Sequence, residues 1–190
     1  MNKLLTLLAL ATAPLSLFAG ATTYTVDPAH SSVGFQVRHL VSKVKGTFGD
    51  FTGTIVLDPA KLSDSSATGE IKIKSVNTNS EKRDGHLQSD DFFKAAKFPV
   101  MTFKSTAWKA GTEPDTYLVT GDLTFAGVTK PITIKLVKTG EAENPMTKGK
   151  VAAFEATGTL NRSDWGMTYG KGLVGEEVTI DIQVEAGIAK

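Results

Sequence analysis

SSVGFQVRHLV, residues 31–41, alternates apolar and polar side chains along most of its length. Successive side chains of a strand point to opposite faces, so one face carries Val33, Phe35, Val37 and His39. The other face carries Ser32, Gln36 and Arg38. The same alternation recurs in residues 71–74, 117–125, 132–136 and 178–184. It predicts an antiparallel sheet that is apolar on its inner face and wet on its outer face.

Working outward from this stretch, Gly, Pro, Asp and Asn clusters separate further segments with strand character. The expected strands are residues 23–27, 31–41, 46–57, 67–76, 100–107, 116–125, 130–138, 150–160 and 177–185. Regular spacing of this kind favours an all-β up-and-down barrel or sandwich over alternating βαβ units. Closure into a barrel would also remove exposed sheet edges.

Residues 77–99 break the alternation. Their apolar residues Leu87, Phe92 and Phe93 have helical spacing. Ser80 is a suitable N-cap for a short helix, and Ser89 before two aspartates is a suitable N-cap for a second. We therefore expect one or two short helices across an end of the barrel.

Small residues interrupt the inner face, where a solid core would need bulk. They fall in phase with the apolar set and are Gly53, Ser105, Gly121, Ala156 and Gly158. The pattern predicts an enclosed cavity. Phe35, Phe51, Phe103, Tyr117, Phe125 and Phe154 also fall on inward faces and would line it. A packed core of the same rings is the alternative.

Residues 1–21 have the features of a secretory signal peptide. Lys3 precedes an apolar run that ends at Leu17, and a small-residue site follows at 19–21. The run is too short for a membrane span, which needs about 20 apolar residues. We expect cleavage after Ala21, a single domain over residues 22–190, and a periplasmic location, with secretion as the alternative.

Charge and cysteine content exclude several classes of function. Without Lys3, the basic and acidic residues are equal in number at 20 each, since the whole chain has 21 Lys and Arg and 20 Asp and Glu. No basic excess indicates binding to nucleic acid or to an anionic membrane. The chain has no cysteine, so thiol chemistry and disulfides are excluded. A homodimer is compatible with the sequence.

Four ordered blocks carry a family resemblance. They are YTVDPAHSSVGFQVRHLVSKVKGTFGDFTGTI, SVNTNSEKRDGHLQSDDFFKAAKFPVMTF, GDLTFAGVTKPITI and LNRSDWGM. Together they resemble the YceI-like family of bacterial polyisoprenoid-binding proteins. The resemblance implies an eight-stranded lipocalin-like barrel that is usually periplasmic. It also implies an interior that holds a long-chain amphiphile such as an isoprenoid or a fatty-acid derivative, and barrels of about eight strands can hold one small ligand.

Histidines offer alternatives to a binding function. The chain has His30, His39 and His86, but no spacing typical of metal ligands, so we expect no metal site and no cofactor. Asp27, His30 and Ser31 lack the geometry of a hydrolase triad, and we expect no catalytic residues. His39 continues the apolar face, which leaves a ligand contact and a structural hydrogen bond both open.

The barrel mouth requires a polar anchor for an amphiphile. Candidates for a phosphate or carboxyl group are Arg38, Lys43, Lys45 and Arg162. Trp165 and Tyr169 lie close to Arg162 in sequence and would flank the entrance. A structural ion pair of Arg162 with Asp164 or another acid is the alternative.

The sequence therefore predicts an exported, non-enzymatic carrier of a long-chain lipid. Its predicted ligand-binding residues are Phe35, Val37, His39, Phe51, Phe103, Tyr117, Phe125, Phe154, Arg162, Trp165 and Tyr169. One alternative is a lipid-modifying enzyme that uses His39 for proton transfer. Another is a structural or partner-binding barrel with a filled core.

Overall fold

The computed structural model describes residues 20–188. The predicted signal peptide therefore lies almost wholly outside the described residues. The strands are β1 (Thr22–Val26), β2 (Ser32–His39), β3 (Ser42–Phe48), β4 (Phe51–Leu57), β5 (Ser66–Lys72), β6 (Val76–Asn77), β7 (Val100–Ala110), β8 (Thr116–Phe125), β9 (Val128–Glu143), β10 (Lys150–Asn161) and β11 (Val174–Ile188). The helical elements are α1 (Glu81–Gln88) and the 3-10 turns η1 (Pro28–His30), η2 (Leu62–Asp64), η3 (Ile73–Ser75) and η4 (Arg162–Trp165).

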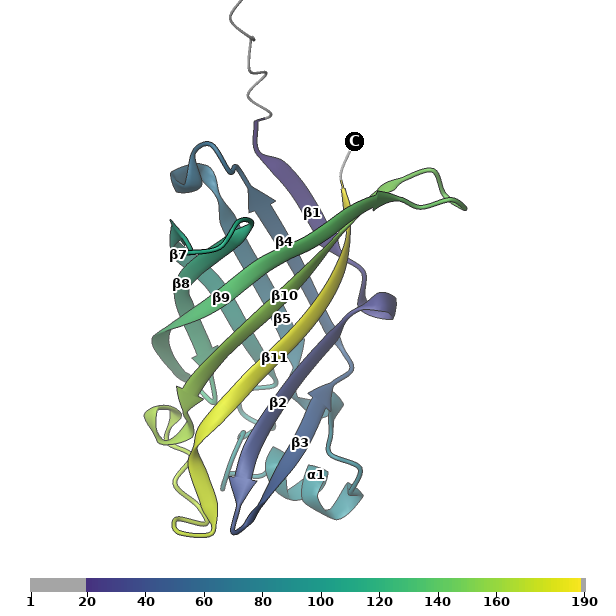
Figure 1. The fold of residues 1–190 in the computed structure, drawn as a ribbon. Helices are drawn as coiled ribbons and strands as arrows, with labels where there is room; N and C mark the ends of the chain where they lie inside the picture. Colours follow the sequence, from purple (N-terminus) through teal and green to yellow (C-terminus); the bar gives the residue numbers. More distant parts are fainter. Residues whose placement is uncertain (1–19, 189–190) are drawn as a thin grey trace, which may run out of the picture.

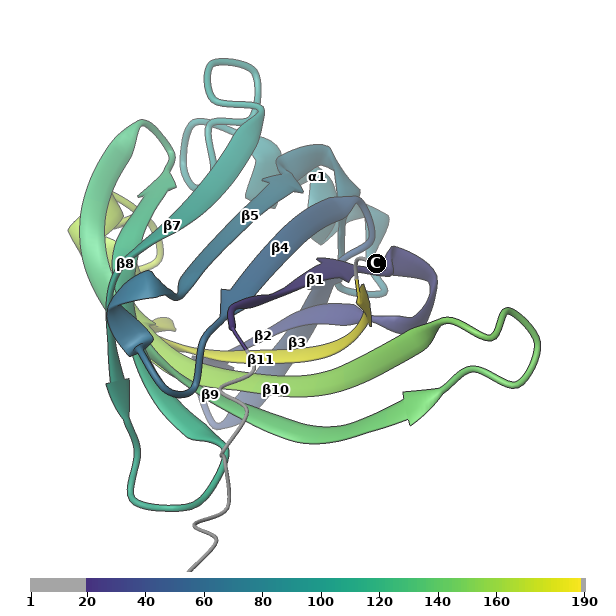
Figure 2. The ribbon, with the colours of Figure 1, turned by 90° about the horizontal axis from the view of Figure 1, so that it is seen from above.

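All of the strand pairs are antiparallel, and the sheet closes on itself because β1 pairs with β11 as well as with β4. Strands β1 and β2 both pair with β11, their other partners are β4 and β3, and β5 and β6 pair in turn with β4 and β3. Three pairs of consecutive strands, β1–β2, β3–β4 and β5–β6, therefore each occupy one position in the wall, so the eleven strands make eight positions. The result is the predicted all-β, eight-stranded antiparallel barrel, seen from above in Figure 2.

The barrel confirms the predicted inner and outer faces. On β11, Val178, Ile180 and Ile182 face the interior, whereas Thr179, Asp181 and Gln183 are exposed. This alternation continues on the neighbouring strand β10. Within residues 20–188, no helix is both long enough and apolar enough to cross a bilayer.

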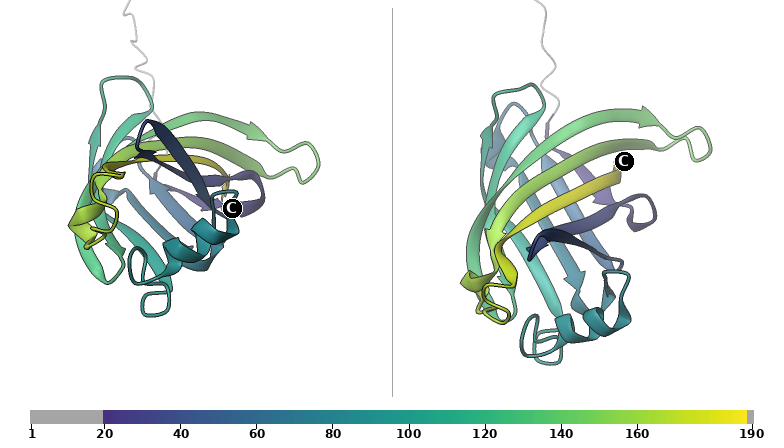
Figure 3. Two further views of the ribbon diagram at one scale, coloured as in Figure 1. Left: turned by 90° about the horizontal axis from the view of Figure 1, so that it is seen from below. Right: turned by 60° about the horizontal axis from the view of Figure 1, so that its bottom comes forward.

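The segment between β6 and β7 contains one helix, α1, which lies at the lower end of the barrel in Figures 1 and 3. Ser80 caps it as predicted, since its side chain accepts a hydrogen bond from the Arg83 amide. The second helix does not form. After Ser89 the chain folds into tight turns, and the Phe93 and Ala95 amides donate to the Leu87 and Gln88 carbonyls.

Two predicted strands are shorter or broken. The segment 46–57 is interrupted at Gly49 and Asp50. The segment 67–76 leaves the sheet after Lys72, where η3 begins and the Ile73 amide donates to the Pro99 carbonyl. The two breaks lie side by side, since the Gly49 amide donates to the Ser75 carbonyl at 3.2 Å and the Lys72 amide donates to the Asp50 carbonyl at 2.9 Å, so local turns override the alternation there.

The side chains inside the barrel form two clusters. One fills the end opposite α1, and we call six of its members the closed-end core: Tyr24, Leu57, Tyr117, Ala152, Phe154 and Ala186. The other cluster lies toward α1 and includes Phe48, Phe92, Phe93, Met101, Leu123, Phe125 and Trp165. An apolar cavity lies between and beside them.

Candidate functional site: an apolar cavity in the barrel

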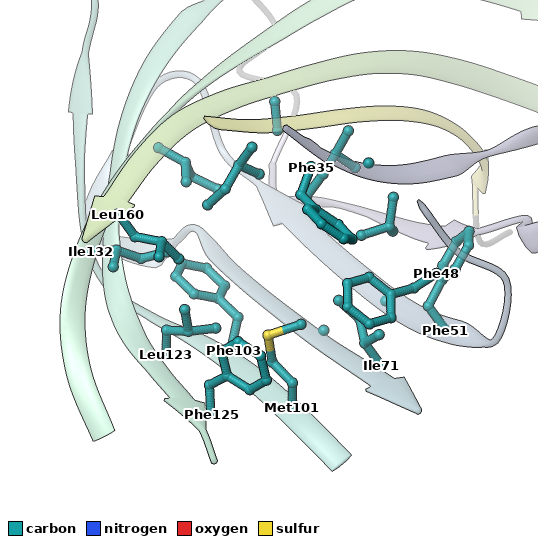
Figure 4. A pocket seen from close by; sticks show the side chains of 18 of the residues that line it. Phe35, Phe48, Phe51, Ile71, Met101, Phe103, Leu123, Phe125, Ile132 and Leu160 are labelled. Carbon is teal, nitrogen blue, oxygen red and sulfur yellow. The ribbon is translucent and has the colours of Figure 1, made fainter. Parts of the chain in front are cut away.

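The barrel encloses a cavity of about 260 Å³. Its lining is almost wholly apolar, and Figure 4 shows ring and aliphatic side chains from several strands pointing into it. The labelled residues are Phe35, Phe48, Phe51, Ile71, Met101, Phe103, Leu123, Phe125, Ile132 and Leu160. The volume lies just below the range of small-molecule sites, which run from about 300 to 1,000 Å³.

Strands β2 and β11 form one wall of the cavity, which we call the β2–β11 wall. Their inward residues are aliphatic or aromatic, yet they are only half-buried: Val33, Phe35, Val37, Val178, Ile180 and Ile182. An inward side chain of a filled barrel would be fully covered by its neighbours. The partial exposure of this set therefore reflects unfilled volume beside it.

The small residues do not all open the cavity. Gly53 and Ala156 line it, as predicted. Gly121 does not, because the Phe103 ring covers it: a Cβ built there would lie 2.4 Å from Phe103 Cζ. Ser105 and Gly158 also lie outside the lining, and the Ser105 hydroxyl instead accepts a hydrogen bond from the Ala67 amide at 2.8 Å.

Five of the predicted contacts line the cavity: Phe35, Val37, Phe51, Phe103 and Phe125. Tyr117 and Phe154 do not, and for them the packed-core alternative is correct. Phe154 is only 1% exposed and meets the Tyr24 ring edge-on at 5.0 Å. Burial raises the pKa of the Tyr117 phenol, so that hydroxyl stays neutral in the closed-end core.

Arg162 is 3% exposed and reaches the cavity, but its guanidinium is fully engaged. Nε donates to the Gly175 carbonyl at 2.8 Å, and Nη1 donates to the Met167 and Tyr169 carbonyls at 2.7 and 2.8 Å. Nη2 donates to the Val174 carbonyl and to Glu176 Oε1 at 3.2 and 3.4 Å. All five N–H donors are therefore used, which disfavours the head-group role. The acid partner is Glu176, and Asp164 takes no part.

Trp165 and Tyr169 do not flank an entrance as a pair. Trp165 is 1% exposed, and its Nε1 donates to the Leu123 carbonyl at 3.2 Å. Tyr169 is half exposed and packs on His86 and Phe92, with ring centroids 5.0 and 5.5 Å away. This aromatic cluster joins the α1 segment to the loop before β11 and covers the outside of the cavity end.

His39 does not point into the cavity, so that expectation is wrong. It is exposed at the last position of β2, where it pairs with Ser42 and Val174. The inward face that includes Val37 continues to His39, and its partner Val174 still lines the cavity, but the His39 side chain is exposed to solvent at the end of the strand. Arg38, Lys43 and Lys45 are exposed outside the cavity as well.

Two other histidines make local contacts. His30 Nδ1 bonds Asp27 Oδ2 at 2.8 Å, and His86 Nε2 bonds Asp91 Oδ2 at the same distance. Asp27, His30 and Glu185 bring ligand-type atoms within 4.8 Å of one another. The Asp27 side chain already accepts from the Ala29 amide and from His30, so this cluster serves as a cap for η1.

Many lining residues were not among the predicted contacts. Val33, Ile71, Ile132, Ile134, Val178, Ile180 and Ile182 belong to the same alternating pattern as the aromatic rings. Selecting aromatics alone therefore missed the aliphatic wall that the pattern already contained. Leu87, Phe92 and Phe93 enter from the α1 segment, and no strand periodicity could identify them.

Fold and site together define a lipocalin-like β-barrel with an internal apolar cavity. The chain belongs to the YceI-like domain family, whose model matches residues 24–186. A UPF0312 protein from Pseudomonas savastanoi pv. phaseolicola is 43% identical over 194 residues, which cover 100% of this chain and 99% of that protein.

Solved structures share the barrel. The crystal structure of the Campylobacter jejuni YCEI protein matches with a TM-score of 0.71 and 37% identity, over 88% of this chain and 98% of that one. A polyisoprenoid binding domain from Saccharophagus degradans, implicated in plant cell wall breakdown, matches with a TM-score of 0.63 over 87% and 98% of the two chains. At 17% identity, that second likeness shows the fold alone.

Proposed function

We propose that this protein is a periplasmic binding protein that sequesters or carries one long-chain lipid, a polyisoprenoid or fatty-acid derivative, with its hydrocarbon inside the barrel. The observation that carries the proposal is the apolar cavity of about 260 Å³. The polyisoprenoid binding domain from Saccharophagus degradans, which shares the barrel, supports the class of ligand. The predicted signal peptide supports the compartment.

The lining favours a ligand whose buried part is hydrocarbon. Arg162 is the sole ionisable residue among the lining side chains, and its donors are occupied. A charged head group would lose its hydration there without gaining a partner. The head group therefore stays outside the cavity, and the volume suits a single slim chain.

No chemical step is proposed. The enzyme alternative needed His39 beside a cavity-bound ligand, and His39 lies outside the lining. The filled-core alternative describes the closed-end core but not the space beside β2 and β11.

Mass spectrometry of gently purified protein, combined with titration of saturated and isoprenoid chains of increasing length, tests the proposal. Each buried methylene is worth about 0.8 kcal/mol, so two more methylenes tighten Kd about 15-fold until the cavity is full. Affinity then stops rising with length. No co-purified lipid, together with no binding across the series, would overturn the proposal.

A pair of neighbouring substitutions locates the bound chain. Ile180→Phe places a ring in the cavity, displaces about two methylenes and weakens binding about 15-fold. Thr179→Phe adds the same ring to the exposed face of the same strand and leaves Kd unchanged. Equal effects of the two variants would place the ligand elsewhere.

A further inference from the structure

The β2–β3 hairpin ends in an exposed apolar turn beside the cavity end. His39 pairs with Ser42, so Leu40 and Val41 form the whole loop. Val41 is fully exposed, and Leu40 is 48% exposed. Figure 1 shows this turn at the same end of the barrel as α1 and at the opposite end from the β9–β10 loop.

The turn chemistry is unusual. Leu40 has a φ of 50°, whereas hairpin loops with a positive φ at the first central residue normally use glycine there. A leucine at that position is strained, and a β-branched valine beside it gains nothing from full exposure to water. Residues that disagree with the local turn preferences are expected at sites that have a function.

A second loop adds to the apolar tip. The Leu40 amide donates to the Leu173 carbonyl at 2.8 Å, which fixes the loop before β11 against the hairpin. Leu173 is 53% exposed. We call Leu40, Val41 and Leu173 the apolar tip.

Basic residues flank the apolar tip. Arg38 lies directly opposite Lys43 across the hairpin, and Lys45 follows on the same outer face. Like charges directly opposite one another destabilise a sheet. Among residues 20–188, Arg38, Lys43, Lys45 and the exposed Lys171 form no ion pair, and Arg38 Nη1 donates instead to the Leu40 carbonyl at 2.7 Å.

Exposed apolar side chains beside a group of unpaired cations match one chemistry, an anionic lipid surface. The apolar side chains enter the acyl boundary while the cations meet the head groups. The cavity lining reaches Val37 and Val174, which lie next to the tip in the chain. The nearly balanced composition of the whole chain conceals this local excess of positive charge.

We propose that the apolar tip and its basic flank dock the barrel on an anionic membrane surface with the cavity end facing the lipid. The proposal rests on the proposed lipid-binding function, because docking there would place the cavity where a hydrocarbon chain can enter or leave.

Vesicle flotation of the full mature chain tests the docking surface. We expect binding to vesicles of equal parts phosphatidylglycerol and phosphatidylethanolamine, weaker binding to phosphatidylcholine vesicles, and weakening by salt. Lys43→Gln with Lys45→Gln is expected to weaken binding about 25-fold, at about fivefold for each cation near the surface. Val41→Ser is expected to weaken it about tenfold through lost apolar burial.

Matched controls come from the barrel's other surfaces. Lys109→Gln with Lys135→Gln removes two exposed lysines that flank the exposed Leu118 across β7, β8 and β9. Met146→Ser removes a residue that is 91% exposed in the β9–β10 loop. Both controls should bind vesicles like wild type, and losses equal to those of the tip variants would overturn the proposal.

Solution binding of the hydrocarbon probes separates the two proposals. Tip variants that keep their probe Kd but lose vesicle binding support docking. If the wild type binds the probes but not anionic vesicles, docking is overturned and the carrier function stands. If it binds vesicles but not the probes, the carrier function is overturned and docking stands. A dimer in sedimentation analysis that Val41→Ser dissociates, without vesicle binding, would make the tip an interface between two copies and overturn docking.

Discussion

The closed-end core and the β2–β11 wall come from one pattern of alternating residues, yet one is solid and the other faces empty space. In the closed-end core, the Tyr24 and Phe154 rings pack edge-on against each other, while the small Ala152 lies opposite the small Ala186 across the β10–β11 pair. On the wall, Val37, Val178 and Ile180 pack against neither buried cluster and border the cavity. Alternation thus decides which way a side chain points, whereas the match of volumes decides whether the interior is filled.

Among the substitutions that test this comparison, Phe154→Ala should reduce the free energy of unfolding most. It removes a ring that is 1% exposed, and the closed-end core cannot collapse around the loss, so we expect about 3–5 kcal/mol of destabilisation in urea unfolding. Ile180→Ala in the wall should cost about 1–2 kcal/mol, because the side chain already borders a cavity. Equal losses would mean that the wall is as tightly packed as the core.

Arg162→Met probes the loop region that borders the cavity. It leaves four backbone carbonyls without their donor, and we expect about 3 kcal/mol of destabilisation, with Arg162→Lys intermediate. The ratio of Kd values for a fatty acid and the matching alcohol should not change, because the guanidinium has no free donor. A selective loss of fatty-acid affinity in Arg162→Lys would restore the head-group role.

Two glycines offer a milder comparison within the barrel. Gly121→Ala forces a Cβ against the Phe103 ring and to 2.6 Å from the Lys104 carbonyl oxygen, and overpacking should cost about 1–3 kcal/mol. Gly69 lines the cavity, and its nearest neighbour to a new Cβ is the Thr52 carbonyl oxygen at 3.8 Å. Gly69→Ala should therefore change stability by less than about 1 kcal/mol. Thermal unfolding of both variants measures the difference.

These contrasts show how far the sequence could predict the site. Alternation correctly placed Phe35, Phe103 and Ile180 on the inner face, but it fails at His39 and beyond the β7 bulge between Ser105 and Ala107. Alternation could not predict how far along the barrel axis each inward side chain lies. Strand tilt and register set that position, and both depend on pairing between distant segments. Phe154 and Phe35 both point inward but lie at different positions along the barrel axis, and only Phe35 lines the cavity.

Arg162 shows a second limit. The donors of a buried guanidinium are satisfied here by carbonyls of residues 167, 169, 174 and 175. Those acceptors are backbone atoms, which carry no residue-specific signal. A loop conformation therefore decides whether this arginine is free for a ligand, and the motif around it could not reveal the answer.

The smallest expected effect lies at the junction between the two regions, where η1 joins β1 of the closed end to β2 of the wall. The hydrogen bond to Asp27 raises the pKa of His30, and the hydrogen bond to His30 lowers the pKa of Asp27. The His30 contribution is present below its ordinary pKa of about 6.5 and is lost as pH rises through the raised value. The Asp27 contribution is present above its ordinary pKa of about 4 and is lost as pH falls through the lowered value.

The Tm difference between wild type and His30→Gln should therefore be largest near pH 5–6 and shrink on both sides. Both groups are exposed, so the difference stays small and salt weakens it. Probe affinity should not change at any pH, because neither side chain lines the cavity. A pH-dependent Kd that His30→Gln abolishes would show that the junction controls the cavity, and the solid and hollow regions would then be coupled rather than independent.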